Sequence, residues 1–197
     1  MQKIVLPIFL LLGAGVIILT ILSIMFILRP EQDAKFGVGA DGFRAFVEEN
    51  GDLGVRSVIT KDQVAAALGD KAKSIGDADV SKVFNLNGDR GQTLSFPFIR
   101  TDGKKASLYV DVKLYKNMQS QEKDHIYTST TKGGTAGGHP VYYKHAQTIG
   151  SEREYHLIVV NGLKAYRFVI AQPAKSMLIN EVASLAALKR LAAEAKL

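Results

Sequence analysis

Cysteine is absent from this sequence of 197 residues. Without cysteine, the chain has no disulfide scaffold, no lipidated cysteine as a membrane anchor and no thiolate nucleophile. The absence of cysteine is consistent with a location on either side of a membrane, so it does not indicate the compartment.

Common catalytic motifs are missing as well. The sequence contains no G-x-S-x-G elbow, no H-E-x-x-H zinc motif, and no carboxylate pair that can be placed on a common face. In KGGTAGGHPVYYKH, residues 132–145, the glycines lead into Pro140 and a strand pattern, whereas a phosphate loop leads into a helix. We expect a flexible connection there that gives a hinge or a close backbone approach, and we expect no cofactor and no recognisable enzymatic centre.

A long hydrophobic run is the most distinctive feature present. From Ile4 to Leu28 the chain has 25 residues without a charge, and 18 of them are Val, Ile, Leu or Phe. A helix of that length can cross a bilayer, and a cleavable signal peptide, the main alternative, has an apolar region about half as long. The sequence therefore predicts a transmembrane signal-anchor helix over residues 1–30, a linker over 31–40 and a soluble α+β domain over 41–197.

Charges near the hydrophobic run give a weaker signal of orientation. Lys3 lies before it, and Arg29, Lys35 and Arg44 follow it, so counting basic residues does not decide the direction. Since so short a segment before an apolar helix usually stays inside, we expect a single-pass protein of the plasma membrane with an extracytoplasmic domain. The net charge is +6, but the basic residues are scattered, which argues against nucleic acid as a partner.

Two helices are predicted early in the domain. Phe43, Phe46 and Val47 follow an i, i+3, i+4 spacing, which is typical of a short amphipathic helix. Thr60 and Gln63 match a capping box at the start of a second helix, and Gly69 is a suitable stop.

From residue 80 the apolar period changes from 3.6 to 2, which indicates strands. A first meander includes a hairpin with a turn at Asp102-Gly103, and Pro97 suggests an edge strand or a bulge. A second meander has strands at 139–149, 152–160 and 163–171, with turns at Gly150-Ser151 and Asn161-Gly162, before an amphipathic helix over 178–192. The predicted fold is α+β: two three-stranded antiparallel meanders flanked by helices.

Two regions resemble a known family. The stretch from GGHPVYYKHAQ through EREYHLIVVNGLKAYRFVIAQP to the final helix is similar to the end of PsbP-like domains, including small exported LpqN-type proteins. The segment ITKDQVAAALGDK looks like the T-x-x-x-V-x-x-x-LG opening of other small exported domains. The resemblance implies an antiparallel sheet with flanking helices that serves binding or assembly, and it assigns no catalytic residue.

The predicted turns also place three polar side chains in one row. If Gly150-Ser151 and Asn161-Gly162 are two-residue turns, His145 lies opposite His156, and His156 lies opposite Arg167. Arg167 could then bind an anion with help from the imidazoles, or the two histidines could bind a metal that lacks an obvious third ligand. A solvated polar row without function is the third interpretation.

These observations predict a membrane-anchored, extracytoplasmic binding or assembly module of the cell envelope. Its expected partners are the membrane and an envelope protein or anionic ligand, with His145, His156 and Arg167 as ligand-binding residues. A small envelope enzyme with a His/Arg polar centre is the alternative. The sequence does not indicate the oligomeric state.

Overall fold

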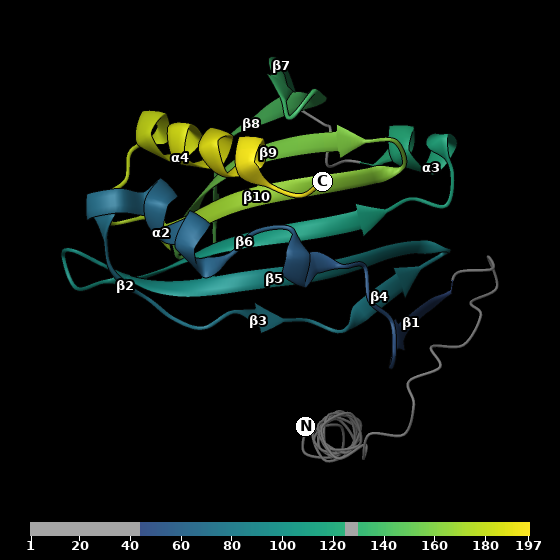
Figure 1. The fold of residues 1–197 in the computed structure, drawn as a ribbon, viewed down its shortest axis with the longest axis horizontal. Coiled ribbons are helices and arrows are strands. Elements are labelled where there is room, and N and C mark those ends of the chain that lie inside the picture. Colours follow the sequence, from purple (N-terminus) through teal and green to yellow (C-terminus); the bar gives the residue numbers. More distant parts are fainter. Residues whose placement is uncertain (1–43, 125–129) are drawn as a thin grey trace, which may run out of the picture. The chain divides into compact units, whose positions relative to one another are not determined.

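A single antiparallel sheet forms most of the protein (Figure 1). The structure is a computed structural model and describes residues 44–124 and 130–197. Eight strands form the sheet in the order β1-β4-β5-β6-β10-β9-β8-β7, and two further strands, β2 and β3, pair with β5. The strands are β1 (Ala45–Glu48), β2 (Ala72–Ile75), β3 (Asp79–Val80), β4 (Val83–Leu86), β5 (Asp89–Arg100), β6 (Lys105–Leu114), β7 (Thr130–Ala136), β8 (His139–Ile149), β9 (Glu152–Asn161) and β10 (Lys164–Pro173).

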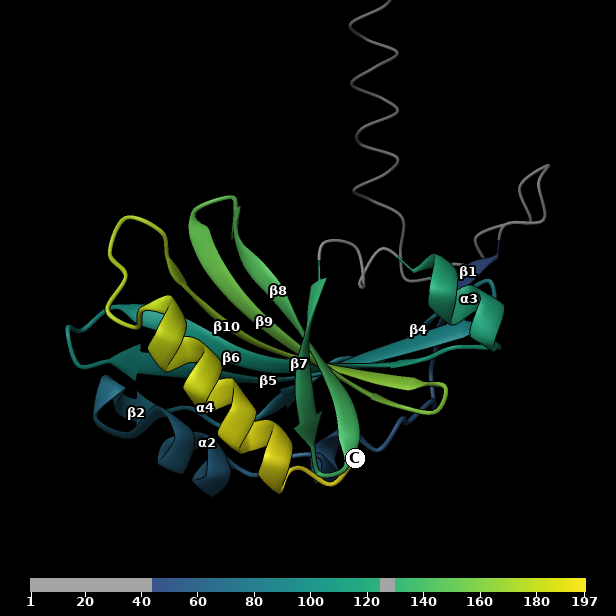
Figure 2. The same ribbon diagram turned by 90° about the horizontal axis from the view of Figure 1, so that it is seen from above.

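Few helices accompany this sheet in the described ranges. They are the 3-10 turns η1 (Val55–Ser57) and η2 (Gly69–Lys71) and the helices α2 (Lys61–Leu68), α3 (Met118–Lys123) and α4 (Glu181–Glu194). Figure 2 shows α2 and α4 together along one face of the sheet, and the two helices contact each other. We call this side the covered face and the opposite side the polar face.

The predicted fold class is wrong in its arrangement. The two expected meanders are one sheet, because β6 pairs with β10 from Lys164 opposite Leu114 to Ala171 opposite Ser107. The result is mostly antiparallel sheet with a few short helices, not two meanders flanked by helices. Across 44–124 and 130–197, every helix is too short or too polar to span a bilayer. The predicted spanning helix over 1–30 and the linker over 31–40 lie outside the described residues.

Strand β5 explains the position of its proline. Along one side it pairs with β6, and along the other it pairs in succession with β2, β3 and β4. Pro97 lies where β2 has ended and β3 has not begun, and its carbonyl accepts a hydrogen bond from the Gly76 amide at 2.7 Å. The missing amide of Pro97 therefore costs no ladder hydrogen bond, although β5 is not an edge strand.

The predicted helix is wrong at Phe46 and Val47, and its first residue, Phe43, lies outside the described residues. Residues 45–48 form the edge strand β1, in which Phe46 and Val47 pair with Asn85 and Phe84 of β4. The i, i+3, i+4 spacing was misleading because pairing with a distant strand overrode the local preference.

The capping box of the next helix is confirmed. The Thr60 hydroxyl accepts from the Gln63 amide at 3.3 Å, and the Gln63 side chain accepts from the Thr60 amide at 2.8 Å. Gly69 ends α2 with a φ of 53°, a conformation that favours glycine. Helix α4 is confirmed too, and it packs on β9 and β10 as expected.

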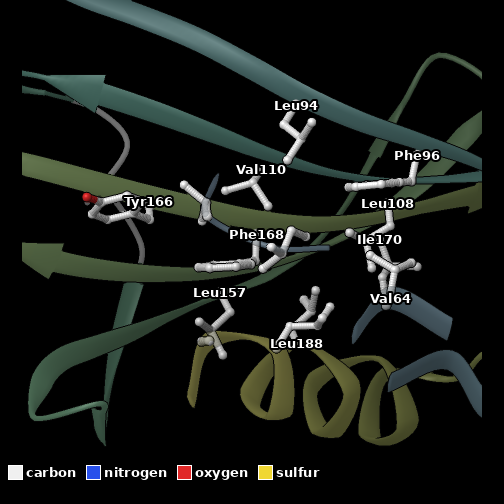
Figure 3. Close-up of a cluster of buried hydrophobic side chains, with 14 of the residues drawn as sticks. Val64, Leu94, Phe96, Leu108, Val110, Leu157, Tyr166, Phe168, Ile170 and Leu188 are labelled. Carbon is white, nitrogen blue, oxygen red and sulfur yellow. The ribbon is translucent and has the colours of Figure 1, made fainter. Parts of the chain in front are cut away.

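The hydrophobic core lies between the covered face and the helices α2 and α4 (Figure 3). Leu108, Phe168 and Leu188 are completely buried there. Because burial of a large apolar side chain stabilises the fold by about 1.5–3 kcal/mol, this layer makes a large contribution to stability.

The glycine-rich segment is a strand and not the flexible connection that we expected. Residues 130–136 form the edge strand β7, and Gly137 and Gly138 make the turn into β8 with φ values of 57° and 84°. A Cβ atom at Gly133 would lie 1.8 Å from the Tyr143 ring, so glycine permits this close approach.

Candidate functional site

The polar face carries a group of ionisable side chains on neighbouring strands. Residues on this face alternate with those of the covered face, because successive side chains in a strand point to opposite sides. The polar face also has buried apolar residues, among them Ile158 and Val169. We call the following set the His156 cluster: Tyr109, Asp111, Lys144, Glu154, His156 and Arg167.

The structure brings His156 and Arg167 together in a different register from the predicted one. Lys164 pairs with Asn161, so the turn is displaced and Arg167 lies opposite Ile158. His156 precedes Ile158 by two residues on β9, so it is the diagonal neighbour of Arg167. The pairing register of β9 and β10 is shifted by two residues from the predicted one, and a shift of two keeps both side chains on the same face. The two predicted residues therefore remain neighbours without being directly opposed.

His145 does not occupy the predicted position. The turn between β8 and β9 is as expected, with Ile149 opposite Glu152, but the register shifts between Lys144 and Gln147. This irregularity puts Lys144, and not His145, opposite His156. The direct pairing on which the His145–His156 metal site was predicted is therefore absent, and no group of three His, Asp or Glu side chains that could hold a metal occurs within the described ranges.

Arg167 is paired with Asp111 of β6. Its Nε donates to Asp111 Oδ2 at 2.9 Å and its Nη2 donates to the same oxygen, while the Thr93 hydroxyl donates to Oδ1 at 2.7 Å. Burial opposes the charge of Arg167, but the attraction of Asp111 outweighs it and raises the arginine pKa. The guanidinium is therefore partly committed within the protein, so it cannot offer an unoccupied fork to an anion.

His156 is the least satisfied polar group of the cluster. Its side chain is 1% exposed, and its Nε2 lies 3.1 Å from Glu154 Oε2 in a direction that forms no hydrogen bond. Both ring nitrogens are buried without a hydrogen-bond partner within the described part of the chain. Burial, followed by the charges of Arg167 and Lys144, lowers the His156 pKa to about 4. The imidazole is therefore neutral at pH 7.

Tyr109 completes the cluster from the β6 side. Burial, and then the charge of Glu154, raises the pKa of its phenol above the usual value of 10, and a hydrogen bond with Glu154 acts in the same direction. The hydroxyl thus stays protonated in any physiological medium, and its proton is donated to Glu154.

The charges of the cluster balance. Arg167 and Lys144 are opposed by Asp111 and Glu154, and His156 is neutral. The cluster therefore presents donors and acceptors with little net charge, and it suits a polar, uncharged ligand better than a free ion.

Sequence reasoning missed Asp111, Glu154 and Tyr109. Alternation did place Asp111 on the polar side of its strand, but only the pairing of β6 with β10 brings it to Arg167. That pairing joins residues at least 50 positions apart in the sequence, and no local pattern marks it.

A second buried polar group, Arg100, lies on the same sheet and is fully bonded. Its side chain is 0% exposed. It donates to Asp102, to Gln172 Oε1 at 2.8 Å, and to the backbone and hydroxyl oxygens of Ser176. This network ties the β5–β6 hairpin to the segment that leads into α4, so it has a structural role.

Comparisons with protein-family models, with curated proteins and with solved structures found no match to this chain. The resemblance to PsbP-like domains therefore stays a prediction.

Proposed function

We propose that the chain is a membrane-attached, extracytoplasmic binding module of the cell envelope, and that the His156 cluster is its ligand site. The observation that carries the binding site is the imidazole of His156, which is buried with both nitrogens unpartnered in the described structure. An unsatisfied buried polar group costs about 1–3 kcal/mol, so it is expected where a ligand supplies the missing partner.

The chemistry of the cluster favours an uncharged ligand that bears hydroxyl or amide groups. A neutral imidazole offers one donor and one acceptor, and the carboxylate of Glu154 offers acceptors beside it. The phenol of Tyr109 adds an aromatic surface next to these groups. Such a combination suits an envelope saccharide or a similar neutral polar molecule.

Membrane attachment is supported by the sequence alone. The run from Ile4 to Leu28 is long enough and apolar enough to hold the chain at a bilayer. An extracytoplasmic domain would meet envelope polymers directly, which is consistent with the proposed ligand.

The ligand site can be tested with the full-length protein in detergent micelles. Maltose and di-N-acetylchitobiose serve as neutral probes and inorganic phosphate as the anionic probe. We expect a neutral probe to raise the Tm of the wild type and of His139→Leu, a histidine outside the cluster, but not that of His156→Leu.

Three other outcomes would change the proposal. Equal Tm shifts in wild type and His156→Leu would show that the probe binds elsewhere. A response to phosphate alone would favour the anionic ligand expected from the sequence, and cleavage of a bound saccharide would favour the small envelope enzyme.

A further inference from the structure

We infer that a cleft beside α3, which we call the α3 cleft, binds a phosphate monoester or a pyrophosphate group. The cleft lies between α3 and the β4–β5 turn, and the polar residues of its lining include Asp89, Lys113, Lys116, Ser120, Lys123 and Asp124. None of them belongs to the His156 cluster. The inference therefore goes beyond the proposed function and does not rest on it.

The α3 cleft is large enough for a small molecule and is held in shape by hydrogen bonds. Its volume is about 360 Å³, and ligand pockets are typically about 300–1,000 Å³. Figure 1 shows α3 and β4 at the same end of the sheet. Asp89, the first residue of β5, accepts from the Lys116 amide at 3.0 Å and from the Ser120 hydroxyl. These bonds hold α3 against the sheet, so the fold fixes both walls of the cleft.

Three lysines line the α3 cleft, and each comes from a different segment. Lys113 belongs to β6, Lys116 precedes α3, and Lys123 is the last residue of α3. The Lys113 ammonium is paired with Asp124, and the Lys116 ammonium donates to the Asn87 carbonyl at 2.7 Å. Lys123 forms no hydrogen bond or ion pair within residues 44–124 and 130–197. Because each ammonium has three donors, most of the donors remain available to a ligand.

The two carboxylates of the cleft are engaged by the chain itself. Asp124 has a side chain that is only 5% exposed, and it accepts from the Lys113 ammonium and from the Tyr115 hydroxyl at 2.9 Å. Asp89 accepts the two hydrogen bonds that hold α3. Three lysines against two aspartates leave an excess of one positive charge in the lining. A concave site with such an excess attracts an anion.

The type of cation indicates the type of anion. Lysine binds phosphate as a point charge, and ammonium groups on three segments suit a ligand with several charged oxygens better than a single carboxylate. The volume of the cleft also leaves room for more than one phosphate group or for an attached ester. A soluble phosphorylated compound and a lipid headgroup share this chemistry.

A second cleft of similar size provides a contrast. It lies between α2 and α4, has a volume of about 380 Å³ and is lined mainly by alanine and other apolar residues. Both of its cations are in ion pairs, Lys71 with Asp70 and Arg190 with Glu194. In the α3 cleft, by comparison, neither Lys116 nor Lys123 has a carboxylate partner within the described ranges. The α3 cleft is therefore the better anion site.

Calorimetric titration of the full-length protein in detergent micelles with inorganic pyrophosphate tests the inference. We expect Lys123→Gln to weaken binding at least about threefold, because it removes a charge that has no other partner. Lys123→Arg keeps the charge and should retain binding. Lys73→Gln removes an exposed lysine of β2, outside the cleft, and serves as the matched control that should bind like the wild type.

A variant with the opposite sign makes the test independent of lost contacts. Asp89→Asn keeps oxygen and nitrogen atoms in place of the carboxylate but removes one negative charge from the lining, so it should strengthen pyrophosphate binding at least about twofold. Glu122→Gln removes an exposed negative charge of α3 that is not part of the lining, and its effect should be smaller. The Tm of each variant shows that it is folded.

Phosphatidic acid in mixed micelles distinguishes the two sources of the phosphate group. If only this lipid binds, and Lys123→Gln weakens it, the ligand of the α3 cleft is a headgroup. Binding of neither probe, or equal binding by wild type and Lys123→Gln, would overturn the inference. Loss of pyrophosphate binding in His156→Leu alone would overturn it too, because the anion would then belong to the His156 cluster. The neutral probes test that cluster separately, so either proposal can fail without the other.

Discussion

Arg100 and His156 are both buried polar side chains of one sheet, and the fold treats them in opposite ways. Arg100 is completely buried, with hydrogen bonds to Asp102, Gln172 and Ser176. His156 is equally buried, yet neither of its ring nitrogens has a hydrogen-bond partner in the described ranges. Arg100 therefore serves the folded chain, whereas His156 is the side chain for which we propose a ligand.

The surroundings of the two residues sharpen this contrast. Gln172, which accepts from Arg100, also exchanges hydrogen bonds with the backbone of Ile179, just before α4. The network thus fixes the segment that brings α4 onto the covered face. The His156 cluster holds no comparable segment in place, because its members all come from strands that the sheet already aligns.

The largest expected effect is the loss of the Arg100 network. Arg100→Met should lower the free energy of unfolding by about 3–5 kcal/mol, because the partners of a buried, multiply bonded charge are left unpaired. Urea denaturation measures the change. Arg190→Met removes an exposed arginine that pairs with Glu194, and it should cost less than about 1 kcal/mol. Equal losses of unfolding free energy in the two variants would contradict the structural role of the Arg100 network.

The next effect concerns acid stability. The pKa of His156 is lowered to about 4 in the folded chain, so between pH 6.5 and 4 the unfolded chain binds a proton that the folded chain does not. Stability should therefore fall as the pH decreases through this range, by up to about 3 kcal/mol. The charges of Arg167 and Lys144 add to this penalty, and that of Asp111 reduces it.

Denaturation curves at pH 7, 6, 5 and 4.5 can separate His156 from the acidic groups. The pKa of Asp102 is lowered to about 2 by its hydrogen bonds with Arg100, so its contribution to stability is lost only below its unfolded value near 4. His156→Leu should remove most of the dependence above about pH 5, since Glu48, whose pKa is lowered by hydrogen bonds with Arg90 and Asn85, contributes mainly below that value. If the stability of His156→Leu still depended on pH in this range, other residues would have to be the cause.

His156→Leu should also change stability at neutral pH, by a smaller amount. Replacing an unpartnered imidazole by an apolar side chain removes a cost of about 1–2 kcal/mol, so the variant should be as stable as the wild type or more so. Calorimetry at pH 7.5 tests this outcome. A loss of more than about 2 kcal/mol would instead indicate that His156 is needed for packing.

Local signals in the sequence predicted the local structure well. The capping box at Thr60, the turn at Gly150-Ser151 and the terminal helix all depend on contacts within a few residues, and all are confirmed. The hairpin at Asp102-Gly103 is confirmed as well, with Thr101 joining the turn as a third residue, since the Arg100 amide donates to Lys104.

The candidate site could be predicted only in part, because its geometry is set by long-range pairing. The shift between Lys144 and Gln147 replaced His145 by Lys144, and no residue in that stretch signals a bulge. The pairing of Asp111 with Arg167 depends on how β6 meets β10, which joins two regions that appeared to be separate meanders. The side of its strand on which each residue lies was therefore predictable, but the residues that become its neighbours across strands were not.

Ser184 gives the smallest and most discriminating test, because it is a third buried polar group. Its hydroxyl is 0% exposed and lacks a partner in the described structure, like the imidazole of His156, but it lies on the side of α4 that packs against the core. Ser184→Ala removes this hydroxyl and raises helix propensity, so it should stabilise the fold by about 0.5–1 kcal/mol. It should leave the Tm shift caused by maltose or di-N-acetylchitobiose unchanged. If Ser184→Ala abolished that shift while His156→Leu kept it, the ligand site would belong to the covered face, and the polar face would be an ordinary surface.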